Sequence, residues 1–252
     1  MKTTKIALFI AVIFFAASCK KDEVKPTSTL DNASLSLASQ SQVVTPPTGL
    51  SNSTDEHAEM AAGWIQSINA VSSYSDYMKP PPGAAKSSTK ITAKNGRVAT
   101  AGDFETWTWT DSQGNSIAYQ ISETVDSYMF DVFLKLSGQA DWYKFLHAEE
   151  KKDKSSGTLY ILDVDGSDPS AKALKYDWTL VGSLFTFNVT SDLDDFAINL
   201  TYHTDTKAGE VIYTINGKKW YDMLWDTHGN GSWTLYNDDG VTVQNNGTWQ
   251  GA

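Results

Sequence analysis

Strict alternation of apolar and polar residues dominates this chain from Gly102 to the C-terminus. Thr106–Thr110 has the sequence Thr-Trp-Thr-Trp-Thr, and comparable runs follow it along the chain. Successive side chains of a β-strand point to opposite faces, so a period of two predicts strands with one buried face. The alternating apolar positions include Ile117, Tyr119, Ile121, Phe130, Val132, Leu134, Leu136, Tyr176, Trp178, Leu180, Phe185, Phe187, Val189, Phe196, Ile198, Leu200, Tyr202, Val211, Tyr213 and Ile215.

Short turn sequences separate these alternating runs. They are Asn216-Gly217, His228–Gly231, Asp238–Gly240 and Asn246-Gly247. Asn-Gly and Asp-Gly pairs supply the positive φ angles that tight hairpins require. The connections are too short for parallel crossovers. The sequence therefore predicts a mostly β fold, an antiparallel up-and-down meander of about a dozen strands over 102–252.

A meander of this length must hide its edges and its apolar face. It can close into a barrel around a cavity, curl into an open half-barrel with a helix in its mouth, or fold back as a sandwich. We favour a barrel or a curled half-barrel, because a single helix suits the role of plug or lid.

One N-terminal helix is predicted over 53–78. Ser53 and Glu56 match a capping box, and the prolines of Pro80–Gly83 end any helix before them. Five apolar residues fall at helical spacing on one face: Ala58, Ala61, Ala62, Ile65 and Ile68. Residues 79–101 are expected to form a loop or an edge strand, so that 53–252 makes a single domain.

The extreme N-terminus has the features of a secretion signal. Lys2 and Lys5 precede the apolar run Ile6–Ala17, which ends in small residues. This run is too short to span a bilayer, which takes about 20 apolar residues. The single cysteine of the chain, Cys19, follows directly, which indicates lipid attachment after removal of residues 1–18. The alternative is an ordinary signal peptide.

Ala16-Ala17-Ser18-Cys19 resembles the lipobox of bacterial lipoproteins, with Ala16 where the family usually has leucine. That departure and the tag Lys20–Glu23 resemble the Bacteroidota type of lipoprotein. The resemblance implies cleavage before Cys19, acylation of Cys19 and an outer-membrane address. The acidic part of the tag favours the cell surface, and a periplasm-facing position is the alternative.

Residues 19–52 are expected to form a flexible tether between the lipid anchor and the domain. The segment is rich in serine, threonine and proline and contains no aromatic residue. It therefore has little apolar surface with which to offset the entropic cost of ordering.

Charge and cysteine content exclude several classes of function. The formal net charge is −10, and cleavage before Cys19 removes two lysines and no acidic residue. Binding to nucleic acid or to an anionic lipid surface needs clustered basic residues, so neither is expected of this domain. Once Cys19 is acylated, no thiol remains for a disulfide, a metal site or a nucleophile.

The best candidate for a metal site is the segment from Asp163 to Asp168. Asp163, Asp165 and Asp168 surround Gly166, and carboxylate oxygens are the ligands that Ca²⁺ prefers. The spacing is not that of an EF-hand. The alternative is a solvated hairpin end before Pro169. No other cofactor is predicted.

Tryptophans are the best candidates for ligand binding, because flat aromatic surfaces stack on sugars and apolar molecules. The candidates are Trp107, Trp109, Trp220, Trp225 and Trp233. By parity Trp220 and Trp225 lie on opposite faces of one strand unless a β-bulge intervenes. The alternative is that these side chains fill the core.

Catalytic motifs are absent from the sequence. It contains no HExxH and no GxSxG, and its four histidines are scattered. Asp222 and Asp226, which flank Trp225, are the first carboxylates to test. We therefore expect a non-catalytic cell-envelope lipoprotein that binds a glycan, or a lipid or other apolar molecule. The alternatives are an accessory lipoprotein that binds a partner protein and, less favoured, an enzyme such as a glycan hydrolase.

Overall fold

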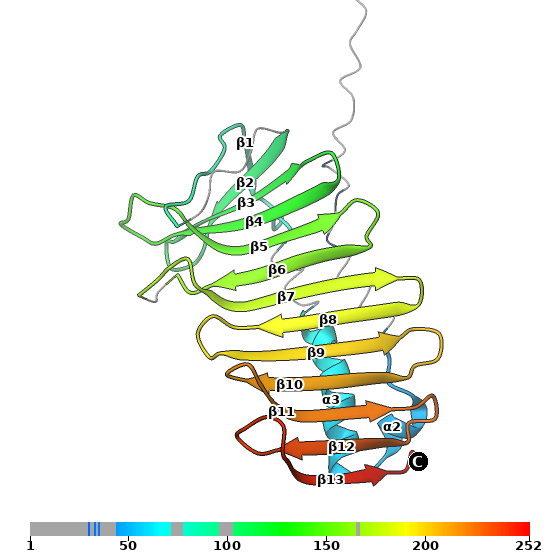
Figure 1. The fold of residues 1–252 in the computed structure, drawn as a ribbon. Coiled ribbons are helices and arrows are strands. Elements are labelled where there is room, and N and C mark those ends of the chain that lie inside the picture. The colour runs from blue at the N-terminus through cyan, green and yellow to red at the C-terminus, as the bar shows by residue number, and fades with distance from the viewer. Residues whose placement is uncertain are drawn as a thin grey trace, which may run out of the picture.

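The computed structural model describes residues 30, 33, 35, 44–71, 78–95, 103–164 and 167–252. Its main feature is one antiparallel sheet of 13 strands, in which every strand pairs with its neighbours in the chain (Figure 1). The strands are β1 (Ala85–Ser87), β2 (Phe104–Thr110), β3 (Ser116–Glu123), β4 (Ser127–Lys135), β5 (Tyr143–Lys151), β6 (Ser156–Leu162), β7 (Lys172–Val181), β8 (Leu184–Thr190), β9 (Phe196–His203), β10 (Gly209–Ile215), β11 (Lys218–Trp225), β12 (Gly231–Tyr236) and β13 (Val243–Trp249).

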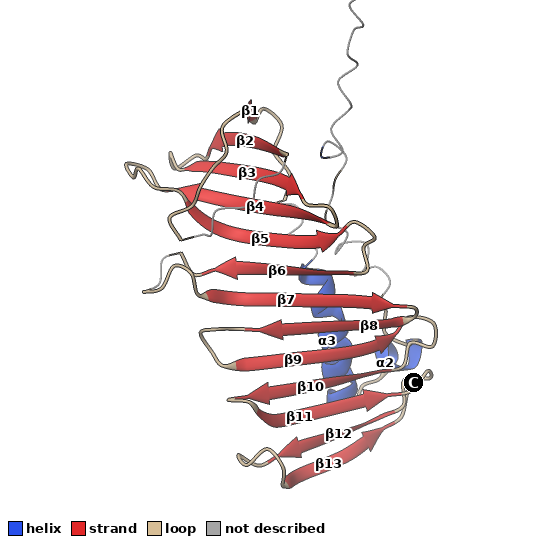
Figure 2. Ribbon diagram, turned by 45° about the horizontal axis from the view of Figure 1, so that its top comes forward, coloured by secondary structure: helices blue, strands red, loops and turns tan. Residues whose placement is uncertain are grey.

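The predicted up-and-down meander is confirmed, and the closed barrel is wrong. The sheet ends at β1 on one side and at β13 on the other, without pairing between them. A helix, α3 (Glu56–Val71), crosses the C-terminal half of the sheet on one face (Figure 2). We call this the helix face and the opposite side the open face. Because α3 covers the apolar side chains there, they can be buried without closure of the sheet.

The apolar stripe of α3 is buried as its spacing predicts. All five of its residues are removed from solvent in the same core cluster: Ala58, Ala61, Ala62, Ile65 and Ile68. On the sheet, this core includes inward-facing residues of neighbouring strands. Among them are Trp178, Phe187, Leu200 and Val211, which lie opposite one another in a single cross-strand row. Trp64 packs at the flank of the stripe, with its ring 6.1 Å from that of Tyr213.

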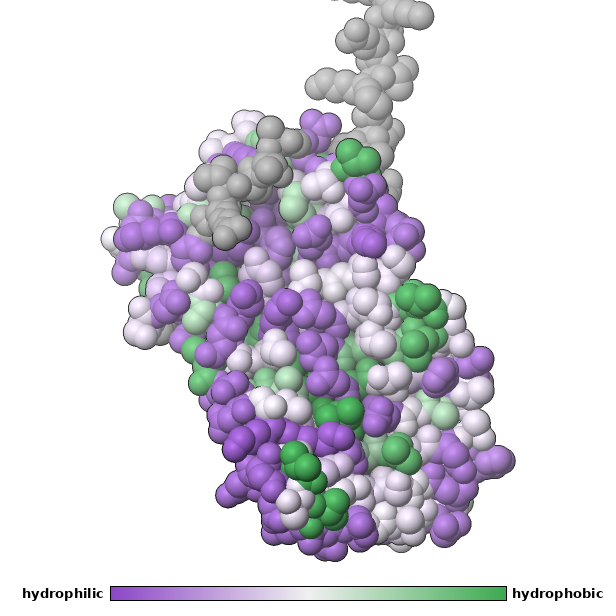
Figure 3. All heavy atoms as spheres, in the orientation of Figure 1, coloured by the Kyte–Doolittle hydropathy of each residue, from purple (hydrophilic) through white to green (hydrophobic). Residues whose placement is uncertain are grey.

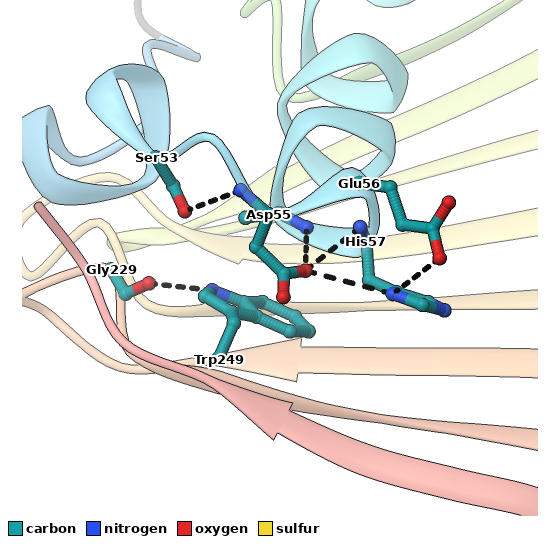
Figure 4. A network of polar contacts seen from close by, with 7 residues as sticks. Ser53, Asp55, Glu56, His57, Gly229 and Trp249 are labelled. Carbon is teal, nitrogen blue, oxygen red and sulfur yellow. Dashed lines mark hydrogen bonds and ion pairs between the residues drawn. The ribbon is translucent and has the colours of Figure 1, made fainter.

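The helix begins at Glu56 and not at Ser53, because Asp55 is its cap (Figure 4). The Asp55 carboxylate accepts hydrogen bonds from the backbone N–H groups of His57 (2.9 Å) and Ala58 (3.3 Å). Ser53 lies before the helix and accepts a hydrogen bond from Asp55 N at 3.2 Å. A carboxylate at this position satisfies free N–H groups of the first turn. The helix is described as far as Val71, and the remainder of the expected helix lies partly outside the described residues.

Residues 44–52 are packed on the domain, although we expected them to belong to the flexible tether. Val44 and Leu50 are buried in the core, and residues Thr48–Asn52 form the short helix α2. The Tyr202 hydroxyl donates to the carbonyl of Thr45 at 2.7 Å. Leu30 and Leu35, which also belong to the expected tether, are buried in the same core, so several parts of that segment contact the domain. Cys19 and the signal sequence lie outside the described residues.

Four tryptophans on the helix face lie over glycines of the adjacent strand. The pairs are Trp178 with Gly157, Trp225 with Gly209, Trp249 with Gly231, and Trp233 with Gly247. A Cβ atom on any of these glycines would overlap the indole ring. The glycines therefore serve close packing, and the ring of each tryptophan fills the space above a residue without a side chain.

Asn246-Gly247 is not a turn, contrary to the sequence prediction. Both residues lie inside β13, where Gly247 makes room for the Trp233 indole, whose Nε1 would lie 2.8 Å from an added Cβ. In contrast, Asn216 and Gly217 do form the predicted hairpin turn, with φ angles of 50° and 69°. The two sites have the same Asn-Gly dipeptide, so packing against other strands decides which one forms a turn and which one lies within a strand.

The open face is polar over the C-terminal strands. One cross-strand row here runs through Thr158, Asp177, Asn188, Asn199, Ile212, Asp222 and Thr234, with Ile212 as its one apolar member. A second row contains Thr179, Thr186 and Thr201. Figure 1 shows α3 behind the sheet, so Figure 3 displays this face, which is largely hydrophilic or intermediate with small apolar spots. Over β2–β5 the same face is covered by Ile91 and Ala93, which pack against Ala118 and Phe133.

We predict that Gly231→Ala destabilises the protein, because the added methyl group collides with the Trp249 ring. Overpacking of this kind costs about 1–3 kcal/mol. The matched control is Gly63→Ala in α3, where an added Cβ meets nothing within 4 Å. This control should stabilise the helix by about 0.5–1 kcal/mol. Urea unfolding of both variants measures the two effects, and equal behaviour would contradict the role assigned to the tryptophan–glycine pairs.

Candidate functional site

An apolar pocket of about 380 Å³ lies at the N-terminal part of the sheet, over β2–β5. It is lined by Lys79, Pro81, Trp109, Ile117, Val132, Phe133, Leu134 and Phe145. Trp109, Ile117 and Val132 also contact the main core, which places most of the lining on the helix face, whereas Phe133 packs with Ala118 on the open face. The pocket is therefore mainly a part of the helix face that side chains do not fill.

The pairing of the strands positions the lining of the pocket. Trp109 lies opposite Ile117 on β3, and Ile117 lies opposite Leu134 on β4, which gives one apolar row across three strands. A register shift between β4 and β5 leaves Phe145 as an extra residue opposite Val132 and Phe133. Bulges of this kind redirect side chains and increase the local twist of a sheet. Lys79 and Pro81 come from the segment that follows α3.

The chemistry of the pocket suits an apolar ligand. Seven of its eight lining residues have apolar side chains, and Lys79 is the charged one. Its volume lies at the lower end of the range of about 300–1,000 Å³ for small-molecule sites. Placing several hydroxyl groups among these side chains would leave them without hydrogen-bond partners, at a cost of about 1–3 kcal/mol each. The pocket therefore fits an acyl or similar hydrocarbon group better than a sugar.

The candidate tryptophans are dispersed over the molecule. Trp109 lines the pocket, and Trp107 is half-buried beside Tyr119, with ring centroids 5.5 Å apart. Trp225 is only 3% exposed, and its indole N–H donates to the carbonyl of Lys207 at 2.9 Å. Trp233 stacks on His57 of α3 at a ring distance of 3.9 Å. These positions do not form one continuous aromatic surface.

Trp220 is the most exposed of the five, at 45%. The sequence places Trp220 and Trp225 on opposite faces of their strand unless a β-bulge intervenes. The pairing of β10 with β11 shifts register between Tyr213 and Thr214, and this shift is such a bulge. The Trp220 ring meets the Tyr213 ring edge-on at 5.4 Å, and Tyr213 in turn contacts Trp64 of α3. Trp220 thus lies by the helix face, near one end of the hairpin.

The calcium candidate is described only in part, since Asp165 lies outside the described residues. The Asp168 carboxylate accepts hydrogen bonds from the backbone N–H of Ser170 (2.9 Å) and from its hydroxyl (2.6 Å), and these bonds lower its pKa. Asp163 lies where β6 ends, and its N–H donates to the carbonyl of Ala171. Within the described ranges, no group of three His, Cys, Asp or Glu side chains is arranged to hold a metal ion.

Asp222 and Asp226 have separate structural partners. Asp222 accepts hydrogen bonds from Lys219 Nζ (3.0 Å) and from the Tyr236 hydroxyl (2.7 Å). Asp226 organises the following turn by accepting from Asn230, whose side-chain hydrogen bond lowers the Asp226 pKa. Neither carboxylate is left unpartnered at a shared cleft.

Sequence reasoning missed a buried ionic cluster on the open face of β4 and β5. Asp131 is only 2% exposed, and one of its carboxylate oxygens, Oδ1, contacts Lys144 Nζ at 2.8 Å and His147 Nδ1 at 2.6 Å. Burial by itself raises the pKa of Asp131, but the bonds and charges of His147 and Lys144 outweigh it and leave the pKa below 3.8. The Tyr160 ring lies 4.7 Å from His147, and burial together with the Asp131 charge raises the pKa of Tyr160 to about 12.

The surroundings of this cluster indicate a structural role. Asn95 donates to the carbonyls of Lys144 (3.0 Å) and Pro169 (2.7 Å), and it accepts from Lys144 N at 2.8 Å. The cluster therefore lies where the segment 91–95 is fixed to the sheet. The alternation of polar residues could have indicated that Asp131 and His147 share a face, but their contact depends on the pairing register of the two strands.

No family model and no curated protein matches the chain. Among the described residues, no helix is long and apolar enough to cross a membrane.

We predict that Asp131→Asn destabilises the protein by about 3 kcal/mol, because it leaves the buried Lys144 ammonium without its counter-charge and His147 without its carboxylate partner. The matched control is Asp177→Asn on the same face, whose ion pair with Lys175 (2.7 Å) is partly exposed. Loss of that pair should cost less than about 1 kcal/mol. Chemical denaturation at pH 7 compares the variants, and equal losses would contradict the analysis.

The effect of Asp131 should also depend on pH. Its folded-state pKa is lower than the usual value of 3.8, so the charged form stabilises the fold. This contribution is fully present above pH 3.8 and is lost as the pH falls through the folded-state value. The difference in unfolding free energy between the wild type and Asp131→Asn should therefore shrink in strongly acidic solution, and a difference that grows there would contradict the assignment.

Proposed function

We propose that this protein is a non-catalytic cell-envelope lipoprotein that binds an apolar molecule, with a lipid acyl chain as the ligand class. The observation that carries the proposal is the apolar pocket over β2–β5. It combines an indole, two benzyl rings and aliphatic side chains in a hollow of the sheet.

The placement of the tryptophans favours an apolar ligand over a glycan. Glycan stacking needs exposed aromatic faces, whereas Trp225 is buried and Trp233 is covered by His57. Trp220 alone of the candidates is largely exposed, and one ring gives a sugar little area. Trp109, by contrast, lies beside other apolar side chains in a concave site, where an acyl chain would remove apolar surface from water on both partners.

The N-terminal anchor supports the same proposal. A lipid group on Cys19 would hold the domain next to a membrane, where acyl chains are abundant. Leu30 and Leu35 are already buried in the core, so the residues between Cys19 and Leu30 would set how far the pocket can reach from that surface. A domain that is held in this way suits the local capture or presentation of a lipid.

Leu134→Trp is predicted to weaken the binding of a long-chain fatty acid at least tenfold, because the larger ring fills the pocket. Tenfold corresponds to about 1.4 kcal/mol of binding free energy. Displacement of a fluorescent fatty-acid probe from the intact chain measures the affinity. The control is Leu224→Trp, the same change at a half-exposed position on β11, far along the sheet from the pocket.

The control protein should bind as the wild type does, and circular dichroism should show that both variants are folded. Wild-type affinity in Leu134→Trp, or no saturable binding of the probe by the wild type, would reject an acyl ligand in this pocket. Binding of a glycan panel by the same wild-type protein would point to the alternative class of ligand.

Cys19→Ser is predicted to abolish the incorporation of an alkyne-labelled fatty acid and to release the protein from the outer-membrane fraction. The reason is that Cys19 is the only thiol of the chain, and a serine cannot form the thioether that anchors a lipoprotein. A Ser18→Ala variant should keep both the label and the membrane association. Labelling of the Cys19→Ser variant would disprove lipidation at this residue.

A further inference from the structure

The two edges of the sheet differ in length and in charge. β1 has three residues, and Lys86 at its centre forms an ion pair with Glu105 at 3.0 Å. β13 has seven residues, and its sequence Val-Gln-Asn-Asn-Gly-Thr-Trp contains no charge and no proline. Edge strands expose unpaired N–H and C=O groups, and proteins usually shorten or charge them to prevent pairing with other chains. β1 is both short and charged, whereas β13 is neither, and its one irregularity is a bulge at Gln244 near its start.

The edge at β13 is held in an extended form by contacts behind it. Its last residue, Trp249, is buried over Gly231, and the indole N–H donates to the carbonyl of Gly229 at 2.7 Å. The residues after it turn away from the edge, since Ala252 N donates to the carbonyl of Gly49 in α2 at 3.0 Å. Among the described residues, only β12 pairs with β13. A strand that is already fixed in this way loses little further freedom when it pairs.

We propose that β13 pairs antiparallel with β13 of a second copy of this chain, which joins the two sheets into one. The inference is independent of the apolar pocket, which lies at the other end of the sheet. A two-fold axis makes such a contact self-complementary and closed. The register centred on Asn246 places Val243 opposite Trp249 of the other copy, and the bulge at Gln244 interrupts the ladder near each end.

The distribution of charge favours a second copy of the chain as the partner, and it favours antiparallel pairing of the two β13 strands. The chain has a net charge of −10, yet no charged side chain of β13 would face a like charge in any register. Asp238 and Asp239 lie in the turn before β13, at one end of the strand. Antiparallel pairing keeps the two acidic turns apart by about 20 Å, since a strand rises about 3.3 Å per residue. That distance exceeds the Debye length of about 8 Å, whereas parallel pairing would place the turns together.

Apolar side chains beside the edge would gain burial from the contact. Val243 is 48% exposed at the start of β13, and Val241 is still more exposed in the turn before it. Pairing would place Val243 near the end of the neighbouring β13, where the chain runs on through the uncharged residues Gln250, Gly251 and Ala252. Asn246 of each copy would meet across the axis, where the two amides can hydrogen-bond.

Disulfide trapping in cells tests the proposal with the full chain in its own membrane. Asn246→Cys should give a covalent dimer on non-reducing gels that disappears with reductant, because the axis brings the two cysteines together. The control is Asn199→Cys, the same change at an exposed position of the open face in the middle of the sheet. Neither this control nor the wild type, which has only Cys19, should give the dimer.

Further variants test the register of the β13 pairing and the effect of a charge placed on this edge. Thr248→Cys should crosslink at least fivefold less than Asn246→Cys, since the axis would place the two copies of residue 248 about 13 Å apart along the strands. Asn245→Lys, added to Asn246→Cys, should reduce the dimer by repulsion, because the axis would place the two copies of residue 245 only about 7 Å apart along the strands. Thr179→Lys on β7 should not reduce it. No dimer from folded Asn246→Cys, equal crosslinking of the Asn199 control, or an adduct with a different protein would overturn pairing with a second copy.

Discussion

Burial of the helix face is the constraint on which the rest of the structure depends. Thirteen strands in a single layer have no second sheet against which to pack, so their apolar side chains need another cover. A single helix supplies it with a narrow stripe of alanine and isoleucine that lets α3 lie close to the large aromatic residues of the sheet. The large side chains are thus on the strands and the small ones on the helix, and the two surfaces complement each other.

One helix is too short to cover so wide a sheet, and this limit determines where the remaining features lie. The strands at the C-terminal half pack against α3, and Val44 and Leu50 fill part of the rest. Over β2–β5 the helix face keeps the apolar pocket, while the open face of the same strands is covered by the segment 91–95. The buried Asp131 cluster belongs to that second cover, because its ionic contacts lie beside the point where Asn95 is bonded to β5. The pocket and the cluster therefore lie on opposite sides of the same strands.

Much of the fold could be predicted from the sequence, because it rests on local periodicity. The period of two predicted the antiparallel strands, and the helical spacing of the alanines and isoleucines predicted the buried stripe of α3. Closure could not be predicted, since an open sheet and a barrel share the same alternation. The position of Asn246-Gly247 within a strand could not be predicted either. Gly247 makes room for the Trp233 ring, and that ring comes from another strand. Of the candidate site, Trp109 was named in advance, but its partners Leu134 and Phe145 depend on strand register and on a bulge.

The β10–β11 and β12–β13 hairpins share the same packing. In each, a tryptophan covers the glycine opposite it, and its indole N–H donates to the carbonyl two residues before that glycine: Trp225 with Gly209 and Lys207, and Trp249 with Gly231 and Gly229. The same pair of contacts thus closes one end of each hairpin. One of these tryptophans lies on the interior strand β11 and the other on the edge strand β13. The contact therefore needs no further strand beyond the tryptophan, and the edge of the sheet is fastened in the same way as its interior.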